Sequence, residues 1–574
     1  MAGATRDLAA RLAALPDDEL ARLLHRRGVA PLAGWRDFFD AAEALTDEAA
    51  VTRAVATLSA TDLEHLDAAG AGEESAASAV ARDLLLLDED GTPLPVVARA
   101  IARTREGSQT VAHDEAPAAD EVAERAAAER AFTSAAALAD ILIRAIRTPL
   151  ARIGAGTIGA ADRRALTEDL QQPDDVDALV ALADWAGLLA GERRRFAPTS
   201  RADDWLADAT AQRWSEVAAV WHRALPAAVR AEAPGSLAPP AEWETAFPAD
   251  AGWPARAALL RRTGIAWGLL TPEGNVPTWT RLLPEHPEQA ANALAALMPH
   301  EVDRIYLQND LTAISPGPLA AARDVRLRRL AQRESHAQAS TYRFTAETIA
   351  GALTEGETAE SILAFLADVS LTGVPQPLEY LVQTTAERHG LVRVGVDPTS
   401  PDGQSRSRVT SSSTQVLDTL EVDQSLRPLG LVRSADGSAL VSRVERDTAL
   451  WALVDARYPA VAVDAHDRVE KLRRHRVAVA PDQADPLTAY APLIARLRTA
   501  GSDDADADWL GRELEAAVRA RDVVAIDVRL PGGETRAFVL EATGIGGGRL
   551  RGREPGAEVE RTLPVSSIVS VRRQ

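Results

Sequence analysis

The stretch DRIYLQNDLTAISPGPL, residues 303–319, begins the part of the chain that decides its fold. Apolar residues alternate with polar ones at its start, which predicts a short strand. Pro316 and Pro318 end that pattern, because proline cannot donate a hydrogen bond to a neighbouring strand. Residues 323–333, which are rich in arginine, then indicate a basic helix. The sequence therefore predicts a strand followed by a basic helix.

The continuation TYRFTAETIAGALTEGETAESILAFLADVS, residues 341–370, opens with a short strand and contains the signals of two helices. Thr345 is placed to cap the N-terminus of the first helix, and Gly356 is placed to end it. A second helix follows, with apolar residues at helical spacing. A third helix over residues 377–389 leads directly into a strand at 391–394. Helix, tight turn, helix and strand in this order predict a winged-helix-like unit beside the basic helix.

Several phrases in this region recur in a known family, namely LQNDLTAISPGPL, ASTYRFTAETIAGAL, EGETAESILAFL and TGVPQPLEYLV. They resemble the helicase-associated domain of actinobacterial proteins, which is related to the N-terminal region of XPB-type DNA repair helicases. The resemblance is close over residues 303–394 and looser over residues 138–464. It implies an accessory to a helicase motor, with DNA and an XPB-like helicase as partners.

The basic residues of the chain are almost all arginines, since Lys471 is the sole lysine. A P-loop requires a lysine that follows a glycine-rich turn and reaches the nucleotide phosphates. Lys471 lies in the phrase DRVEKLRRHR, which contains no such turn. We therefore expect no ATPase engine, no enzymatic activity and no cofactor in this chain.

The formal net charge is −21 at pH 7, so the chain as a whole does not attract nucleic acid. Any contact with DNA must come from local basic patches on an acidic body. A solvated helix face or an internal ion pair is the alternative for every such arginine. The candidate nucleic-acid contacts are Arg326, Arg328, Arg329, Arg333 and Arg343, followed by Arg473, Arg474 and Arg476.

Composition and pattern divide the 574 residues into several domains, mainly α and α+β in class. Residues 1–110 and 125–230 each predict a helical, winged-helix-like unit, and for the first a plain helical packing domain that does not bind nucleic acid is the slightly favoured alternative. Residues 255–480 form the helicase-associated α+β domain in this prediction. Residues 485–574 are expected to form a helix and a small C-terminal β-barrel.

The C-terminal tail from residue 523 contains short alternating strands separated by glycine-rich turns, which predicts the small barrel. Its strand, glycine-rich hairpin and ERTLPVSSIVSV ending resemble WYL domains, the ligand- and oligonucleotide-sensing modules of bacterial regulators. The Trp-Tyr-Leu triplet of that family is missing here, and Leu550-Arg551-Gly552 stands near its place. The resemblance implies an anionic-ligand face made of Arg549, Arg551, Arg553 and Arg561.

Several classes of chemistry lack the residues that they need. The chain has no cysteine, and its ten histidines are scattered without metal-ligand spacing, so we expect no metal site. No apolar run reaches the length of a membrane span. The N-terminus lacks the apolar core of a signal peptide, which favours a cytoplasmic location.

Three functional hypotheses follow from the sequence. The first is a non-catalytic DNA-binding or helicase-partner accessory in DNA repair or related transactions, which would hold phosphates without reading bases. The second is a transcriptional regulator whose C-terminal barrel senses a nucleotide or oligonucleotide. The third is an acidic protein–protein adaptor that competes with DNA for the basic channel of a partner.

Overall fold

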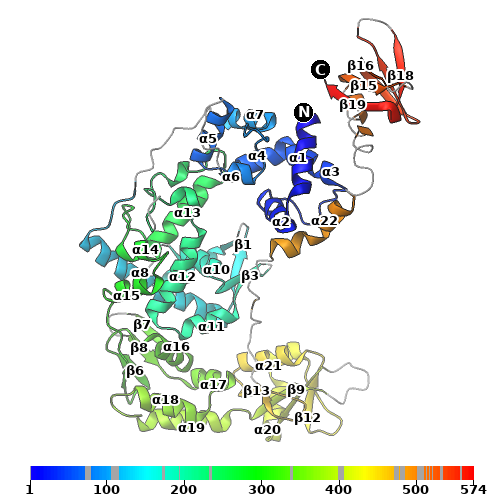
Figure 1. Cartoon of the computed structure of the whole chain (residues 1–574). Coiled ribbons are helices and arrows are strands. Elements are labelled where there is room, and N and C mark those ends of the chain that lie inside the picture. The colour runs from blue at the N-terminus through cyan, green and yellow to red at the C-terminus, as the bar shows by residue number, and fades with distance from the viewer. Residues whose placement is uncertain are drawn as a thin grey trace.

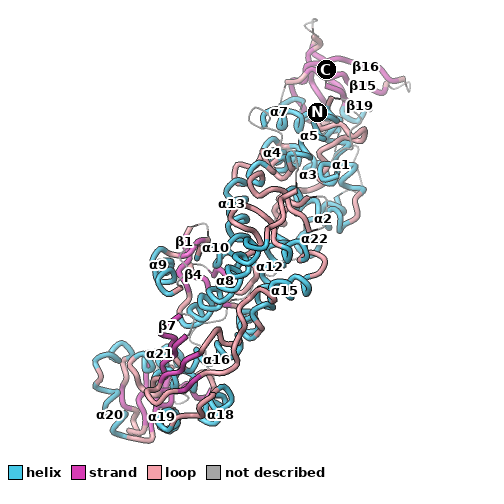
Figure 2. Tube along the Cα trace, turned by 90° about the vertical axis from the view of Figure 1, so that its left-hand side faces the viewer, coloured by secondary structure: helices cyan, strands magenta, loops and turns pink. Residues whose placement is uncertain are grey.

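The fold was analysed in a computed structural model, which shows a multi-domain mixed α/β protein with several small sheets. Figures 1 and 2 show an elongated row of units, with both chain termini near one end. The structure describes residues 2–71, 79–104, 115–154, 156–170, 175–192, 194–231, 235–336, 340–397, 406–470, 478, 485–500, 510–511, 514–515, 517–519, 521–530, 534–555 and 559–573.

Helices from opposite ends of the sequence share the core nearest the N-terminus. They are α1 (Ala2–Ala14), α2 (Asp17–Arg26), α3 (Phe38–Thr46) and α22 (Pro486–Ala500). Leu493 and Leu497 of α22 are buried in this core, and Arg498 adds a 3.0 Å ion pair with Asp17. The predicted division at residue 485 remains a prediction, but α22 shares its core with the N-terminal helices α1 to α3.

A second helical core follows directly in the chain. It contains α4 (Glu48–Val55), α5 (Ala60–Gly70), α6 (Ala79–Asp83) and α7 (Pro95–Thr104). Leu87 and Pro93 pair in an isolated antiparallel bridge, and a tight turn connects them. Gly91 in this turn has a φ of +82°. Glycine adopts that left-handed conformation without steric cost, which explains its position.

The long helix α8 opens the largest unit, which we call the α8–α15 unit. Its first half consists of α8 (Glu121–Arg147), β1 (Leu150–Ile153), β2 (Thr157–Ile158), α9 (Ala160–Asp169), α10 (Val176–Trp185), β3 (Leu189–Glu192) and β4 (Arg195–Pro198). These strands form one antiparallel sheet in the order β2-β1-β4-β3. A helix, two short strands, two helices and a hairpin thus follow one another. The winged-helix-like unit predicted for residues 125–230 remains a prediction.

Tryptophans fill the core of the second half of this unit. Its helices are α11 (Ser200–Ala207), α12 (Thr210–Ala224), α13 (Trp253–Ala266), α14 (Thr278–Leu282) and α15 (Pro287–Ala295), with 3-10 turns at Ala227–Val229 and Trp243–Thr245. The Trp214 indole donates to the Trp267 carbonyl at 2.9 Å, and the Trp267 indole donates to the Trp214 carbonyl at 3.0 Å. Both side chains are fully buried, so they serve packing and cannot stack on bases.

The stretch that decides the fold forms a compact unit of its own, here called the β5–α19 unit. It comprises β5 (Tyr306–Leu307), β6 (Thr312–Ser315), α16 (Ala321–Leu330), β7 (Gln332–His336), β8 (Ser340–Arg343), α17 (Ala346–Thr354), α18 (Ala359–Val369) and α19 (Gln376–Arg388). Its sheet has the order β5-β6-β8-β7. Thr345 caps α17 through a reciprocal hydrogen-bond pair with Thr348, and Gly356 ends it at a φ of +104°. Both local predictions are confirmed.

The strand that follows α19 belongs to a different core, and this corrects the predicted winged-helix-like order. That strand, β9, lies in a six-stranded sheet of order β11-β12-β10-β9-β13-β14, in which only β9 and β13 are parallel. It therefore does not return to the three helices before it. The elements are β9 (Val392–Val396), β10 (Ser407–Ser411), α20 (Thr414–Val422), the 3-10 helix Gln424–Leu429, β11 (Val432–Arg433), β12 (Ala439–Ser442), α21 (Arg446–Asp455), β13 (Ala460–Val463) and β14 (Val469–Glu470).

The C-terminal strands form an open sheet, so the predicted closed barrel is not confirmed. The strands are β15 (Val523–Arg529), β16 (Thr535–Gly546), β17 (Arg549–Arg553), β18 (Glu560–Pro564) and β19 (Ile568–Arg573), in the order β18-β17-β16-β15-β19. Within the described residues, the edge strands β18 and β19 each pair with one neighbour and not with each other. A 3-10 turn, Val565–Ser567, joins these two edges. A closed barrel requires the two edge strands, β18 and β19, to pair with each other.

Leu497→Ala should weaken the packing of α22 on α1 and α2 by about 2–5 kcal/mol, because it removes a fully buried side chain and leaves a cavity. Leu487→Ala in the same helix is the control. Leu487 is 40% exposed, so its loss should change stability by no more than about 0.5 kcal/mol. Hydrogen-exchange protection of the α1 and α2 amides measures both. Equal effects of the two substitutions would contradict the shared core.

Candidate nucleic-acid interface

The first group of predicted arginines lies where the β5–α19 unit meets the α8–α15 unit. Helix α16 buries Val325, Leu327 and Leu330, so its arginines emerge on the remaining sides of the helix. Val325 itself joins the core of the α8–α15 unit. The group consists of Arg326, Arg328 and Arg329 on α16, Arg333 on β7 and Arg343 on β8.

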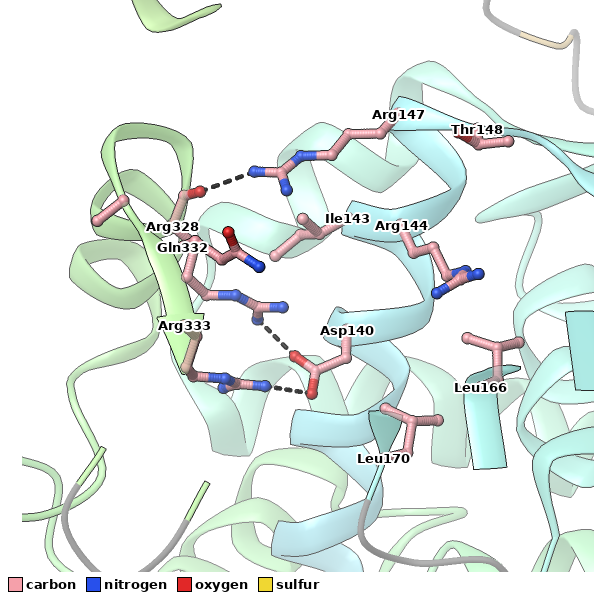
Figure 3. A pocket seen from close by; sticks show the side chains of 11 residues that line it. Asp140, Ile143, Arg144, Arg147, Thr148, Leu166, Leu170, Arg328, Gln332 and Arg333 are labelled. Carbon is pink, nitrogen blue, oxygen red and sulfur yellow. Dashed lines mark hydrogen bonds and ion pairs between the residues drawn. The ribbon is translucent and has the colours of Figure 1, made fainter. Parts of the chain in front are cut away.

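Two of these arginines share a carboxylate from the other unit. Arg328 Nη1 lies 2.5 Å from Asp140 Oδ1, and Arg333 Nη2 contacts Asp140 Oδ2. The three side chains are only 11–13% exposed. Figure 3 shows both guanidinium groups reaching from α16 and β7 toward Asp140 on α8. This charge cluster therefore ties the two units together.

A second carboxylate completes the surroundings of Arg328. Asp324, one turn earlier on α16, lies 3.4 Å from Arg328 Nη1 and accepts a 2.6 Å hydrogen bond from the Tyr342 hydroxyl. Burial opposes the charge of Arg328, but Asp140 and Asp324 outweigh it and raise its pKa. Burial and the nearby Asp324 raise the pKa of Tyr342 well above its usual range. At neutral pH the cluster is thus a charged arginine with a neutral tyrosine.

Arg326 faces the helices of its own unit. Its guanidinium makes two hydrogen bonds to the Glu357 carboxylate, at 3.0 and 2.9 Å, and donates to the Ser361 carbonyl at 3.2 Å. The same group lies 4.6 Å from the ring centroid of Phe365, within reach of a cation–π contact. A bidentate pair of this kind holds a planar guanidinium firmly in one orientation.

The remaining two members of the group also face carboxylates, at more exposed positions. Arg329 Nη2 lies 3.7 Å from Asp203 of α11, and Arg343 Nη2 donates to Glu334 at 3.3 Å. All five arginines of the first group therefore have an acidic neighbour within the protein. A phosphate would have to displace that neighbour, so the structure does not bring these residues together as a free phosphate-binding surface.

Sequence reasoning missed the α8 residues of this junction. Asp140 is the sole acidic residue in the apolar run between Ala131 and Ile146, where a charge is expected to be buried against a partner. That signal was available in the sequence. The partners, Arg328 and Arg333, were not deducible from it, because they lie far along the chain.

The C-terminal sheet presents a different arrangement of arginines. Arg549, Arg551 and Arg553 alternate along β17 with buried residues, and all three are exposed. No ion pair is found for them within the described part of the chain. Since alternate residues of a strand point to the same face, the three guanidinium groups form one row. We call these three residues the β17 row.

Arg561, the fourth predicted ligand residue, lies apart from the β17 row. It pairs across the sheet with Gly552, on the opposite face. Its guanidinium lies 3.1 Å from Glu554 and 5.3 Å from the ring centroid of Phe538. The predicted four-arginine face therefore reduces to three residues. The predicted contacts Arg473, Arg474 and Arg476 lie outside the described residues.

Helix α10 holds the place that the recognition helix has in a helix-turn-helix unit. Here α10 packs against α8, α12 and α13, and most of its residues are buried. Arg262 of α13 also makes a bidentate ion pair with Asp175, which caps α10. The only exposed side chain on α10 is Asp184, an acidic residue. This helix is therefore closed to a DNA groove.

The described residues contain no group of three His, Asp or Glu side chains that is arranged to hold a metal ion. Of the helices that the structure describes, none combines the length and the apolar character needed to cross a membrane.

Comparison with known proteins places a family described as "Helicase conserved C-terminal domain" on residues 305–435. This match covers the β5–α19 unit and strands β9, β10 and β11 of the adjoining six-stranded sheet. We call the matched region the helicase-related domain. No curated protein matches the chain. The helicase-related character predicted for this region is confirmed, and it indicates a part in nucleic-acid transactions.

Asp140→Ala should destabilise the junction by about 3–5 kcal/mol, because it leaves Arg328 and Arg333 buried without their shared carboxylate. Glu334→Gln is the control, since it removes the partner of Arg343 from a pair in which both side chains are well exposed. That change should cost no more than about 1 kcal/mol. Hydrogen exchange at the α16 and β7 amides measures both variants. If Asp140→Ala and Glu334→Gln lowered the stability of the junction equally, the buried pairs of Asp140 would contribute no more than the exposed Arg343–Glu334 pair.

Proposed function

We propose that this protein is a non-catalytic accessory of nucleic-acid transactions, which binds DNA through the β17 row and acts beside a helicase in DNA repair or a related process. The observation that carries the proposal is the contrast between two sets of arginines. Those of α16, β7 and β8 face carboxylates of the protein, whereas the β17 row is exposed and has no ion-pair partner in the described residues.

The surface beside the β17 row supports this role. Gly544 and Gly546 of β16 lie opposite Arg551 and Arg549, and a side chain added at either glycine would meet no atom within 4 Å. Glycine in a strand often marks a place where a ligand comes close to the backbone. Successive arginines on one strand face stand about 6.6–6.8 Å apart, a repeat that an extended nucleic-acid strand can follow. Two carboxylates, Glu541 and Glu560, lie opposite Arg553 and limit the row at that end.

Binding of this kind positions DNA and does not read its sequence. Contacts of arginine with phosphate fix orientation but carry no base information. The winged-helix-like unit, whose α10 is covered, adds no major-groove reading in this proposal. Its place would be structural, as a support that holds the helicase-related domain. The motor would be a separate XPB-like helicase, because Lys471 is not placed for a P-loop.

The triple variant Arg549→Glu, Arg551→Glu, Arg553→Glu should weaken DNA binding at every sequence and flatten its salt dependence. Each lost phosphate contact changes the slope of log K against log salt by about 0.7–0.9, so the expected change is about 2–3. The control reverses the charge of three exposed arginines elsewhere in the chain, Arg22 on α2, Arg36 in the loop before α3 and Arg125 on α8, and so has the same net charge.

Fluorescence anisotropy with a labelled single strand and a labelled duplex, at four or more salt concentrations, measures both slopes. If the control triple weakened DNA as much as the β17 triple, net charge alone would explain the effect and the row would be excluded.

The acidic adaptor remains a second candidate, because the net charge is −21 and the central arginines are engaged within the protein. Under the adaptor hypothesis, we expect a helicase partner to bind the wild-type chain and the β17 triple variant equally. Neither of these two proteins should then bind DNA measurably. The hypothesis of a sensing regulator predicts a different result. A mononucleotide should then raise the melting temperature of the wild type and leave that of the β17 triple variant unchanged.

A further inference from the structure

A pocket of about 420 Å³ lies at the tips of the two hairpins of the α8–α15 unit. Its lining comes from β1 and from the turns that follow β1 and β3, and consists of Arg152, Ile153, Gly154 and Arg194. The two hairpins are joined at this point, because the Arg152 amide donates a hydrogen bond of 2.8 Å to the Arg194 carbonyl. The volume lies within the range of about 300–1,000 Å³ that small-molecule sites occupy. We call this space the hairpin pocket.

The neighbours of the Arg152 side chain leave a defined space for its guanidinium group. The guanidinium carbon lies 5.5 Å from the ring centroid of the buried Phe196, within reach of a cation–π contact. Two glycines lie beside the same group. A Cβ atom added at Gly191 would come within 2.8 Å of Arg152 Nε, and one added at Gly156 would come within 3.2 Å of Nη2. The absence of side chains at these glycines therefore provides the space that the guanidinium occupies.

The arginines of the hairpin pocket have hydrogen-bond donors that the described protein does not use. The Nε atom of Arg152 is inaccessible to solvent and has no hydrogen-bond partner in the described residues. Buried donors are normally satisfied, so such an atom calls for an explanation. No ion pair of Arg152 or Arg194 is found among the residues that the structure describes. An acceptor from outside the chain would complete the bonding of both guanidinium groups.

One described carboxylate acts on Arg152 from α10. Burial raises the pKa of Asp184, and the positive charge of Arg152 opposes this shift, although the two side chains form no direct ion pair. The turn residues that lie outside the described part of the chain, Ala155 and Arg193, have no acidic side chain. Asp184 therefore moderates the positive charge of Arg152 and leaves Arg194 without an ion-pair partner in the described residues.

We propose that the hairpin pocket binds a phosphate group, contributed by a nucleic-acid strand or by a free nucleotide. The planar fork of arginine matches the oxygens of phosphate, and charge-assisted hydrogen bonds of this type are among the stronger ones in proteins. Arg152 donates from its defined position beside Phe196, and Arg194 donates from the neighbouring turn. Ile153, which is 51% exposed, offers apolar surface to the sugar or base that adjoins the phosphate.

The hairpin pocket is a site separate from the β17 row. Strands β1 and β3 lie in the middle of the molecule, whereas the C-terminal sheet lies at one end (Figure 1). The α8–α15 unit also contacts the helicase-related domain through Asp140 and Arg328. A phosphate in the hairpin pocket is therefore bound by the unit that adjoins the helicase-related domain. This inference does not rest on the β17 row, so either site can fail its test without the other.

The test uses the full-length protein and inorganic pyrophosphate in isothermal titration calorimetry, at constant ionic strength set with sodium chloride. Arg152→Gln and Arg194→Gln should each weaken pyrophosphate binding by about tenfold or more, the loss expected when a hydrogen bond between charged groups is removed. The β17 triple variant should bind pyrophosphate at the hairpin pocket as the wild type does. Circular dichroism verifies that each variant is folded.

Two further variants separate the position of a charge from its presence. Gly191→Ala keeps every charge, but its added Cβ would displace Arg152 Nε, so it should also weaken pyrophosphate binding. Arg195→Gln is the matched control. It removes one positive charge from the same hairpin, but Arg195 lies opposite Glu192, on the other face from Phe196. Arg195→Gln should therefore bind pyrophosphate as the wild type does.

Three results would overturn the proposal. The first is a wild-type protein that does not bind pyrophosphate beyond the effect of sodium chloride, or that loses all binding in the β17 triple variant. The second is wild-type affinity in folded Arg152→Gln and Arg194→Gln variants. The third is an equal loss of affinity in Arg195→Gln and Arg152→Gln, which would show that net charge alone explains the effect. Arg194 lies in an exposed turn, so its variant keeps the test valid even if Arg152→Gln does not fold.

Competition then identifies the source of the phosphate. ATP and a 5′-phosphorylated single-stranded oligonucleotide are each titrated against protein saturated with pyrophosphate. Displacement by ATP alone supports a nucleotide site, whereas displacement by the oligonucleotide supports a strand site. If neither ligand displaced pyrophosphate, both sources of the phosphate would be excluded and the proposal would be wrong.

Discussion

One buried carboxylate, Asp140, governs the middle of this molecule. Burying a single charge is costly unless it is paired, and Asp140 is paired twice, with Arg328 and Arg333. Those two arginines come from a segment that begins almost two hundred positions further along the chain. The same cluster gives α8 a fixed place against α16 and β7.

The charge of the whole chain explains why most of these arginines are paired within the protein and a few are exposed. A protein with a net charge of −21 offers most arginines a carboxylate nearby, and an internal pair is then the more favourable arrangement. Arg326 with Glu357 and Arg343 with Glu334 are examples. On β17, by contrast, alternation of the strand sends three arginines to one open face beside glycines. Such positions leave the guanidinium group available to a ligand.

Predictions that depend on a few neighbouring residues were confirmed, and those that depend on distant pairing were not. Thr345 and Gly356 limit α17 as expected, because capping and a left-handed turn involve only adjacent backbone. The strand after α19 exists, but its partners β10 and β13 draw it into another sheet. The closed barrel failed for the same reason, since closure requires the two outermost strands to meet. Candidate arginines were found by type, but their partners were not.

The amino-acid sequence alone determined the order of the central elements, the helicase-related character of that region and the kind of side chain at each candidate site. These properties reside in local patterns of polarity, turn residues and charge, which neighbours along the chain specify. The tertiary structure decided which arginines are engaged and which are free, that α10 is covered, and that α22 joins the N-terminal helices. Burial and ion pairing are properties of segments brought together in space, so no local pattern can encode them.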